Sequence, residues 1–255
     1  MYPVLFSIGA FEIRASYVFL AFGLLAGGLF GRREARRMGY DGKKVRLFLL
    51  SVIPFALLLA AANGVLFWLG WDSLLENLLH GSTGGVVAFG AVLGALFLGW
   101  VFARHDGVPV GPVLDLVSLT LPLILAIYRV GCLLNGCCYG LETDGPLGMY
   151  LPGAAGMWAT RYPTQIMLAV FDLGLFAWLW VRRERRPLDG SLTLSFLILF
   201  CLGRLAIDAL RDLPRAWGPF SLHQLASIVI LAVTLYAAIE LRLARPAGNN
   251  QRARL

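Results

Sequence analysis

The stretch Leu116–Cys138, LVSLTLPLILAIYRVGCLLNGCC, contains a single charged side chain, that of Arg129. A helix needs roughly 20 predominantly apolar residues to cross about 30 Å of hydrocarbon. Inside a bilayer the backbone must pair its own polar groups, and this favours a helix over an open strand. The stretch therefore predicts a membrane-spanning helix that carries a cation.

Similar stretches occur along the rest of the chain, which has 255 residues, of which 58% are hydrophobic and 15% charged. An ordinary soluble domain is about 25% charged, so this composition excludes a disordered protein, a coiled coil and a disulfide-stapled secreted module. We predict an all-α membrane protein, a polytopic bundle of about seven transmembrane helices forming one integral membrane domain over residues 1–255. The other six predicted spans are Ala15–Gly31, Leu47–Trp71, Gly81–Ala103, Gln165–Val181, Ser191–Leu210 and Leu222–Ile239.

The net charge of +7 is distributed unevenly between the two sides that seven spans would define. One side holds 16 of the 22 Lys and Arg residues, in segments 32–46, 104–115, 182–190 and 240–255. Cytoplasmic loops carry the excess of Lys and Arg. We therefore expect an outside N-terminus, a cytoplasmic C-terminus and a multi-pass protein of the plasma (inner) membrane. The charge needs no nucleic-acid partner. The Gly- and Pro-rich segment Tyr139–Thr164 is expected to be a loop on the outer face.

Charges inside the predicted spans indicate a functional site. An Arg at a helix centre costs roughly 2.5–3.5 kcal/mol on insertion scales, so such residues usually face a polar cavity or a partner. Arg129 either faces such a cavity or extends outward to the interface. On the sixth span Arg204, Asp208 and Arg211 lie at i, i+4 and i+7, on one face. They either form a structural Arg–Asp pair or, with Arg129, bind a phosphate, which Arg matches by bidentate hydrogen bonds. In a membrane, that phosphate would be a phospholipid headgroup.

Small residues and thiols each leave alternatives open. Gly23, Gly27 and Gly31 recur every four residues, as do Gly90 and Gly94. They favour close helix packing, with a groove for an acyl chain as the alternative. The thiols Cys132, Cys137 and Cys138 are buried apolar groups, a disulfide on an oxidising face, or redox groups. Their C-x4-C-C spacing matches no zinc pattern, and the three histidines are scattered, so we predict no metal site and no cofactor.

Several motifs together resemble the prolipoprotein diacylglyceryl transferase family, over nearly the whole chain. They are the opening segment Pro3–Arg14, Arg129-Val130-Gly131 with Asn135-Gly136 and Gly140, Arg161-Tyr162-Pro163-Thr164-Gln165, Gly203-Arg204 with Asp208 and Arg211, and His223-Gln224.

The resemblance implies transfer of a diacylglyceryl group from phosphatidylglycerol to the lipobox cysteine of a preprolipoprotein, with glycerol phosphate as the leaving group. The expected partners are therefore phosphatidylglycerol, other membrane lipids and a preprolipoprotein signal peptide. Arg129 and Arg204 would hold the phosphodiester and stabilise the charge on the leaving phosphate. Asp208 is the carboxylate candidate for the base, with Tyr128 or a cysteine thiolate as alternatives. The residues expected to bind substrate are Asn135, Gly136, Gly140, Arg211, Arg161, Gln165 and Tyr128.

The sequence departs from the family pattern at several positions. Phe89 stands where the family has a His that is a candidate base, and Tyr162 stands in place of another His. Cys132 and Cys137 replace an Asn and a Glu of the signature. Two other functions therefore remain open: a phospholipid-dependent transferase of the same fold with a different acceptor, and a non-catalytic lipid-binding or lipid-transporting membrane protein.

Overall fold

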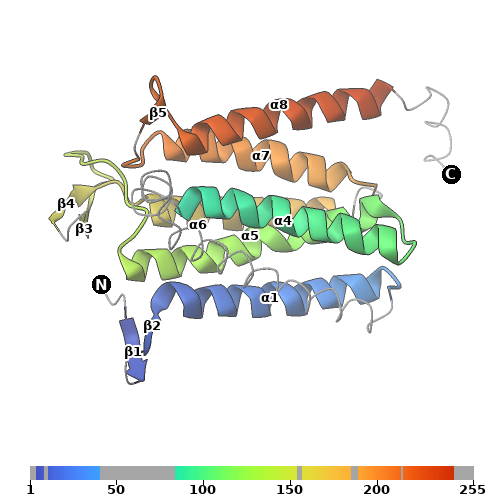
Figure 1. Ribbon diagram of the computed structural model, residues 1–255, viewed down its shortest axis with the longest axis horizontal. Helices are drawn as coiled ribbons and strands as arrows, with labels where there is room; N and C mark the ends of the chain where they lie inside the picture. The colour runs from blue at the N-terminus through green and yellow to red at the C-terminus, as the bar shows by residue number, and fades with distance from the viewer. Residues whose placement is uncertain are drawn as a thin grey trace, which may run out of the picture.

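A computed structural model describes residues 4–8, 11–40, 84–153, 157–184, 189–213 and 215–243. Within these ranges the chain forms long antiparallel helices and three short hairpins (Figure 1). The predicted span Leu47–Trp71 lies outside the described residues. The described helices are α1 (Ala15–Arg37), α4 (Gly84–His105), α5 (Val110–Asn135), α6 (Thr164–Arg182), α7 (Ser191–Asp208) and α8 (Leu222–Leu243).

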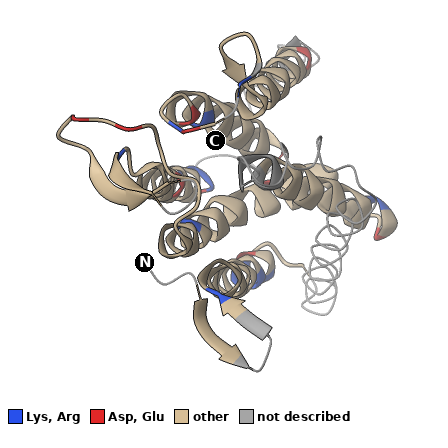
Figure 2. Ribbon diagram, turned by 60° about the vertical axis from the view of Figure 1, so that its left-hand side comes forward, with Lys and Arg blue, Asp and Glu red and all other residues tan. Residues whose placement is uncertain are grey.

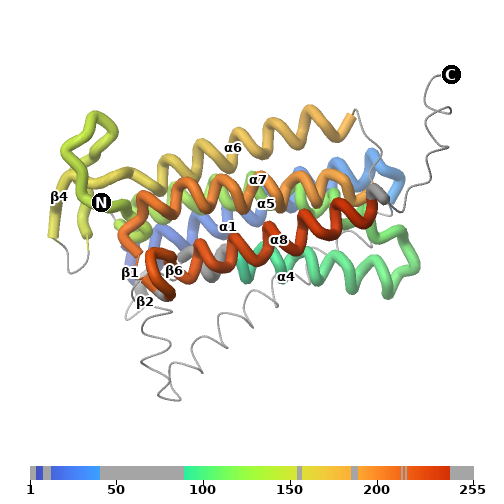
Figure 3. The backbone as a smooth tube through the Cα atoms, turned by 90° about the horizontal axis from the view of Figure 1, so that it is seen from above, coloured from blue at the N-terminus to red at the C-terminus, as the bar shows by residue number. Residues whose placement is uncertain are grey.

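The helical membrane bundle that the composition predicts is confirmed. Five of the described helices, all except α4, are long and apolar enough to cross a membrane, and α4 contains a shorter apolar helix, Phe89–His105. Each predicted span within the described ranges overlaps one of these helices. The helices run side by side along the long axis of the molecule (Figure 3). The count of seven spans and the orientation remain predictions.

Helix α5 lies at the centre of the bundle and packs against α1, α4, α6 and α7. The buried apolar core consists of side chains from α4 to α7, with Phe196 and Phe200 of α7 stacked on each other. The outer helices instead turn large apolar side chains outward, such as Leu25 of α1 and Val233 of α8. An apolar outer surface over a packed core is what a bundle surrounded by lipid requires.

The glycine pattern of α1 forms a packing seam against α5. A Cβ added to Gly23 would lie 2.9 Å from the backbone oxygen of Ile124, and one added to Gly27 would collide with the Ile124 side chain. A Cβ on Gly31 would lie 3.1 Å from the Thr120 side chain. Missing side chains therefore let the two helix backbones approach closely, and the packing interpretation of this pattern holds. Gly90 differs, because a Cβ there would meet nothing within 4 Å among the described residues.

The three antiparallel hairpins gather at the end of the bundle where α1 begins, whereas α8 ends at the other end (Figure 1). The sequence predicts only a loop over 139–164, yet part of it pairs as a hairpin in which Tyr150 and Trp158 place their rings 5.4 Å apart. The strands are β1 (Val4–Ile8), β2 (Phe11–Arg14), β3 (Met149–Pro152), β4 (Trp158–Arg161), β5 (Arg215–Trp217) and β6 (Phe220–Ser221).

Helix α5 ends earlier than the predicted span. Its C-cap is Gly136, whose left-handed φ of 69° is readily adopted by glycine and stops the helix. The predicted boundary at Cys138 is therefore wrong by three residues. As a result Cys137 and Cys138 lie in the loop that follows the helix.

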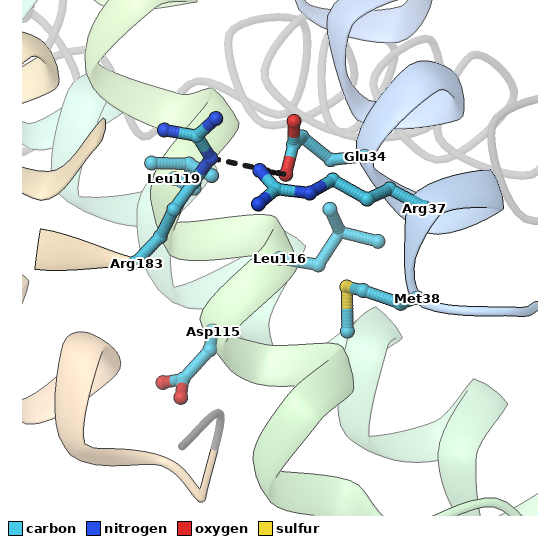
Figure 4. Close-up of a pocket in the computed structure, with 7 residues that line it drawn as sticks. All are labelled: Glu34, Arg37, Met38, Asp115, Leu116, Leu119 and Arg183. Carbon is cyan, nitrogen blue, oxygen red and sulfur yellow. Dashed lines mark hydrogen bonds and ion pairs between the residues drawn. The ribbon is translucent and has the colours of Figure 1, made fainter. Parts of the chain in front are cut away.

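Ionised groups fix the helices to one another at the end opposite the hairpins. Asp115 of α5 accepts hydrogen bonds from the backbone N–H groups of Gly190 and Thr193 at the start of α7, at 2.9 and 2.8 Å. This carboxylate caps α7 and sets its register against α5. Nearby, Arg183 donates to Glu34 at 3.1 Å across a cavity of about 250 Å³ (Figure 4).

Candidate active site

Five ionisable side chains lie buried towards the hairpin end of the bundle. We call them the arginine cluster: Arg129 of α5, Asp172 of α6, Arg204 and Asp208 of α7, and Arg211 just beyond α7. Each is at most 3% exposed. Figure 2, which brings the hairpin end forward, shows basic and acidic positions on neighbouring helices. With both carboxylates ionised, three arginines face two aspartates, so one positive charge is uncompensated.

Asp208 joins two of the arginines. Its Oδ2 lies 3.0 Å from Nη2 of Arg204, and its Oδ1 accepts a hydrogen bond from Nη1 of Arg211 at 3.1 Å. Arg204 and Asp208 are four residues apart and Asp208 and Arg211 three apart, which places all three side chains on one face. The Arg–Asp ion pair that the sequence indicates as one alternative is therefore present. Since both carboxylate oxygens are held by cations, Asp208 is suited to orient the arginines rather than to accept a proton.

Arg129 is 2% exposed and does not extend outward to the interface. Its Nε and Nη1 atoms have no hydrogen-bond partner among the described residues, and the same is true of Nε and Nη1 of Arg204. The two guanidinium groups are close enough to interact electrostatically, and both interact with Asp172. Buried guanidinium donors without partners are costly, which favours a bound anion at this position.

Asp172 and His223 also lie at the site, although the sequence alone indicates no role for either of them. Asp172 is 1% exposed, with an Oδ1 that has no hydrogen-bond partner among the described residues. His223, at the start of α8, is 1% exposed, and both of its ring nitrogens lack such a partner. His223 interacts electrostatically with Arg204, Asp208 and Arg211. Each of these residues interrupts an apolar run, and that same signal drew attention to Arg129.

Arg161, the last residue of β4, and Gly140 lie in the segments that cover the hairpin end of the bundle. Arg161 donates to Glu142 at 2.6 Å and to Asp212 at 3.3 Å, and it lies over the ring of Tyr139. The Arg161 guanidinium group is thus already paired with two carboxylates, those of Glu142 and Asp212. A Cβ on Gly140 would lie 2.6 Å from the Tyr162 carbonyl oxygen, and Gly140 pairs with the backbone of Arg211. Gly140 therefore permits the close approach that holds the segment carrying Arg211.

The remaining predicted residues surround the end of α5. Gln165 donates to the Cys137 carbonyl oxygen at 2.8 Å. Tyr128 precedes Arg129 and has its ring 5.9 Å from that guanidinium group. Asn135 is the last residue of α5, and its buried Oδ1 has no partner among the described residues, whereas Gly136 acts as the helix cap.

Phe89 borders the arginine cluster on the side of α4. Its ring is 4% exposed, and the Arg204 guanidinium lies 5.6 Å from the ring centroid. Phe89 also packs edge-on against Phe200. An aromatic face stabilises the nearby cation but transfers no proton, so the position at which the family has His holds a cation–π contact here.

Apolar helices of this length around buried arginines define a polytopic membrane protein. Comparison with known sequences identifies the family. Residues 3–239 match the prolipoprotein diacylglyceryl transferase family, and the chain belongs to it.

Similar proteins include a phosphatidylglycerol–prolipoprotein diacylglyceryl transferase of Dehalococcoides mccartyi (strain ATCC BAA-2100), 32% identical over 91% of each chain. A protein of the same name from Clostridioides difficile is 26% identical over 89% of this chain and 90% of its own length.

Proposed function

We propose that this protein transfers a diacylglyceryl group from phosphatidylglycerol to the lipobox cysteine thiol of a preprolipoprotein. Family membership and the names of its relatives support this reaction. The observation that carries it is the set of buried donor atoms on Arg129 and Arg204 that have no hydrogen-bond partner among the described residues. With both aspartates ionised, the arginine cluster also keeps one positive charge. A phosphodiester carries one negative charge and would balance the cluster. Such a donor matches the cluster better than a neutral lipid does.

The reaction proceeds by displacement at a glycerol carbon. The substrate sulfur forms a bond to that carbon as the carbon–oxygen bond to phosphate breaks, and glycerol phosphate leaves with the electron pair. Charge grows on the phosphate oxygens, and Arg129 and Arg204 stabilise it from fixed positions in a water-poor site. Asp208 holds Arg204 and Arg211 in place through the two ion pairs.

The thiol proton requires an acceptor, and His223 is the residue that we propose. Its two ring nitrogens are buried without partners among the described residues, and it lies beside the cluster. Phe89 does not accept a proton, and both oxygens of Asp208 are engaged with arginines. Tyr128 is a poorer acceptor at neutral pH, because phenols remain protonated there.

The other predicted binding residues are proposed to shape the substrate site from outside the cluster. Arg161, Gln165 and Gly140 hold the loops at the hairpin end, and Asn135 offers its amide to the headgroup. The signal peptide would approach this same end from the lipid. The charge distribution favours a cytoplasmic location for the end where α1 terminates, in a plasma (inner) membrane, with the N-terminus outside.

The deciding experiment supplies the purified full-length protein with phosphatidylglycerol and a lipobox peptide. The expected products are a thioether-linked diacylglyceryl peptide and glycerol phosphate. Arg129→Ala should reduce kcat roughly 10²–10³-fold, as loss of a charge-stabilising donor does. Arg104→Ala is the matched control, because Arg104 is exposed near the opposite end of the bundle. No product from the wild-type protein, in parallel with an active relative, would refute the proposal.

A different acceptor is the second candidate, favoured by Phe89 at the position where the family has His. The same assay separates the two functions. Release of glycerol phosphate without the peptide thioether, in an Arg129-dependent manner, would establish phospholipid-dependent transfer to another nucleophile.

A further inference from the structure

Three thiols converge at the end of α5, although their spacing in the sequence matches no familiar metal-binding pattern. The Sγ atoms of Cys132, Cys137 and Cys138 all lie within 4.8 Å of one another. Two left-handed residues produce this convergence, Gly136 with φ 69° and Cys138 with φ 62°. Together they turn the chain back over the last turn of α5. Among the described residues Cys138 is the only non-glycine with a positive φ, a conformation that side chains other than glycine adopt at a cost.

Neighbouring residues hold this loop in position. The N–H of Cys137 donates to the Cys132 carbonyl oxygen at 3.2 Å. From the first turn of α6, Gln165 donates to the Cys137 carbonyl oxygen at 2.8 Å and Thr164 to the Cys138 carbonyl oxygen at 2.7 Å. The backbone that carries the three thiols is thus fixed from two helices, and this fixes a left-handed conformation that would otherwise relax.

We propose that Cys132, Cys137 and Cys138 bind one soft d10 metal ion, Zn²⁺ or Cu⁺, as three thiolates. Metal–sulfur bonds of about 2.3 Å place tetrahedral thiolates about 3.8 Å apart, so the three sulfur atoms need to approach by at most about 1 Å. Each metal–sulfur bond forms as the thiol proton is released to water. Soft thiolates select these ions over hard cations such as Mg²⁺ or Ca²⁺.

The surroundings favour a metal–thiolate group with a net negative charge. Three thiolates around Zn²⁺ carry a net charge of −1, and around Cu⁺ a net charge of −2. Arg129 and Arg211 both interact electrostatically with Cys138, so two guanidinium groups lie within range of the site. Cys137 and Cys138 are half-buried, which leaves an ion access from the hairpin end.

A disulfide is the competing use of these residues, but the geometry favours a metal. A disulfide joins two sulfur atoms about 2.05 Å apart and leaves the third thiol without a role. In this loop each of the three sulfur atoms lies within 4.8 Å of the other two. A metal site would use all three as ligands, whereas a disulfide would use two. Cys201, the fourth cysteine, lies on α7 outside this group and supplies an internal control.

The test uses the full-length protein, purified in detergent, reduced and stripped of metal. Cd²⁺ serves as the probe for the Zn²⁺ arm, and sulfur-to-cadmium charge-transfer absorption should saturate at one ion per chain. In the Cu⁺ arm a colorimetric Cu⁺ chelator competes with the protein, again with one ion expected. Cys132→Ser and Cys138→Ser should each abolish tight binding, whereas Cys201→Ala should retain it.

A second measurement guards against variants that fail to fold. In the wild-type protein, bound metal should slow maleimide alkylation of Cys137 and Cys138 at least tenfold, as mapped by mass spectrometry of peptides. Unchanged alkylation in saturating Zn²⁺ and Cu⁺ would overturn the proposal. A disulfide between any two of these cysteines in protein isolated under alkylating conditions would overturn it as well. Neither measurement depends on transferase activity.

Discussion

Hydrogen-bond and ion-pair partners distinguish the roles of Asp208, in the arginine cluster, and His223 beside it. Asp208 and His223 are buried to similar extents, but the carboxylate is engaged by two arginines whereas the imidazole has no partner among the described residues. This difference favours a positioning role for Asp208 and proton transfer for His223, and two substitutions separate these roles.

Asp208→Asn removes the charge that binds Arg204 and Arg211. Breaking a buried ion pair from one side leaves uncompensated charge, so the free energy of unfolding should fall by about 3–5 kcal/mol. Thermal unfolding in detergent measures this loss. Glu184→Gln is the control, because the Glu184 side chain is 58% exposed and should change stability by less than about 1 kcal/mol. Equal effects of the two substitutions would contradict the buried-pair interpretation.

His223→Gln tests proton transfer. General-base catalysis typically contributes about 10²–10⁴-fold, so kcat should fall by that order while KM for phosphatidylglycerol changes little. The wild-type rate should decline towards low pH as the imidazole becomes protonated, and the variant should lose this decline. His105→Gln, at an exposed position, should keep both the rate and the pH profile. A variant with the wild-type pH profile would exclude His223 as the base.

The sequence predicts three of the buried charges better than it predicts their neighbours. Arg129, Arg204 and Asp208 stand out because a charge in an apolar run is costly wherever the run folds. Asp172 and His223 interrupt apolar runs in the same way, but their proximity to the arginines depends on how α6 and α8 pack, which no local pattern specifies. The convergence of the three thiols likewise depends on Gly136 and Cys138 adopting left-handed conformations.

At the scale of helices, boundaries and contacts are set by small residues and caps. Apolar runs predict which segments are helical, because a bilayer leaves the backbone few alternatives. They predict that α7 begins at Ser191, but not that α5 ends at Asn135 or that the Asp115 carboxylate caps α7. The end of α5 is set by Gly136, and the start of α7 is held by one capping side chain from another helix.

The seam between α1 and α5 should tolerate no added volume. Gly27→Val places methyl groups where the Ile124 side chain lies, and overpacking of this kind costs about 1–3 kcal/mol. The midpoint of thermal unfolding should therefore fall. Gly174→Val on α6 is the matched control, since a Cβ there meets nothing within 4 Å among the described residues. A Gly27→Val variant as stable as Gly174→Val would mean that the seam is not tightly packed in the membrane.

At the scale of the whole molecule, the two ends of the bundle differ in charge as the sequence predicts. The C-terminal part of α1 carries Arg32, Arg33, Arg36 and Arg37, and α6 ends at Arg182. These segments lie at the end of the bundle where α8 also ends (Figure 1). The excess of Lys and Arg favours this end on the cytoplasmic side.

The orientation is tested with reporters fused to the C-terminus of the full chain. A green fluorescent protein should fluoresce there, because it folds in the cytoplasm, and alkaline phosphatase should be inactive. As a control, each reporter should give the opposite result when fused to a fragment that ends within the outer loop at Asp144. An active C-terminal phosphatase with a dark fluorescent protein would reverse the predicted orientation.

The glycine seam of α1 also restricts the route by which a lipid reaches the arginine cluster. Helix backbones that approach this closely leave no room for an acyl chain between α1 and α5, so that side of the bundle is closed to lateral diffusion from the bilayer. A two-tailed donor must therefore arrive through another face of the bundle. The small residues that hold α1 in place thus close one route of substrate approach.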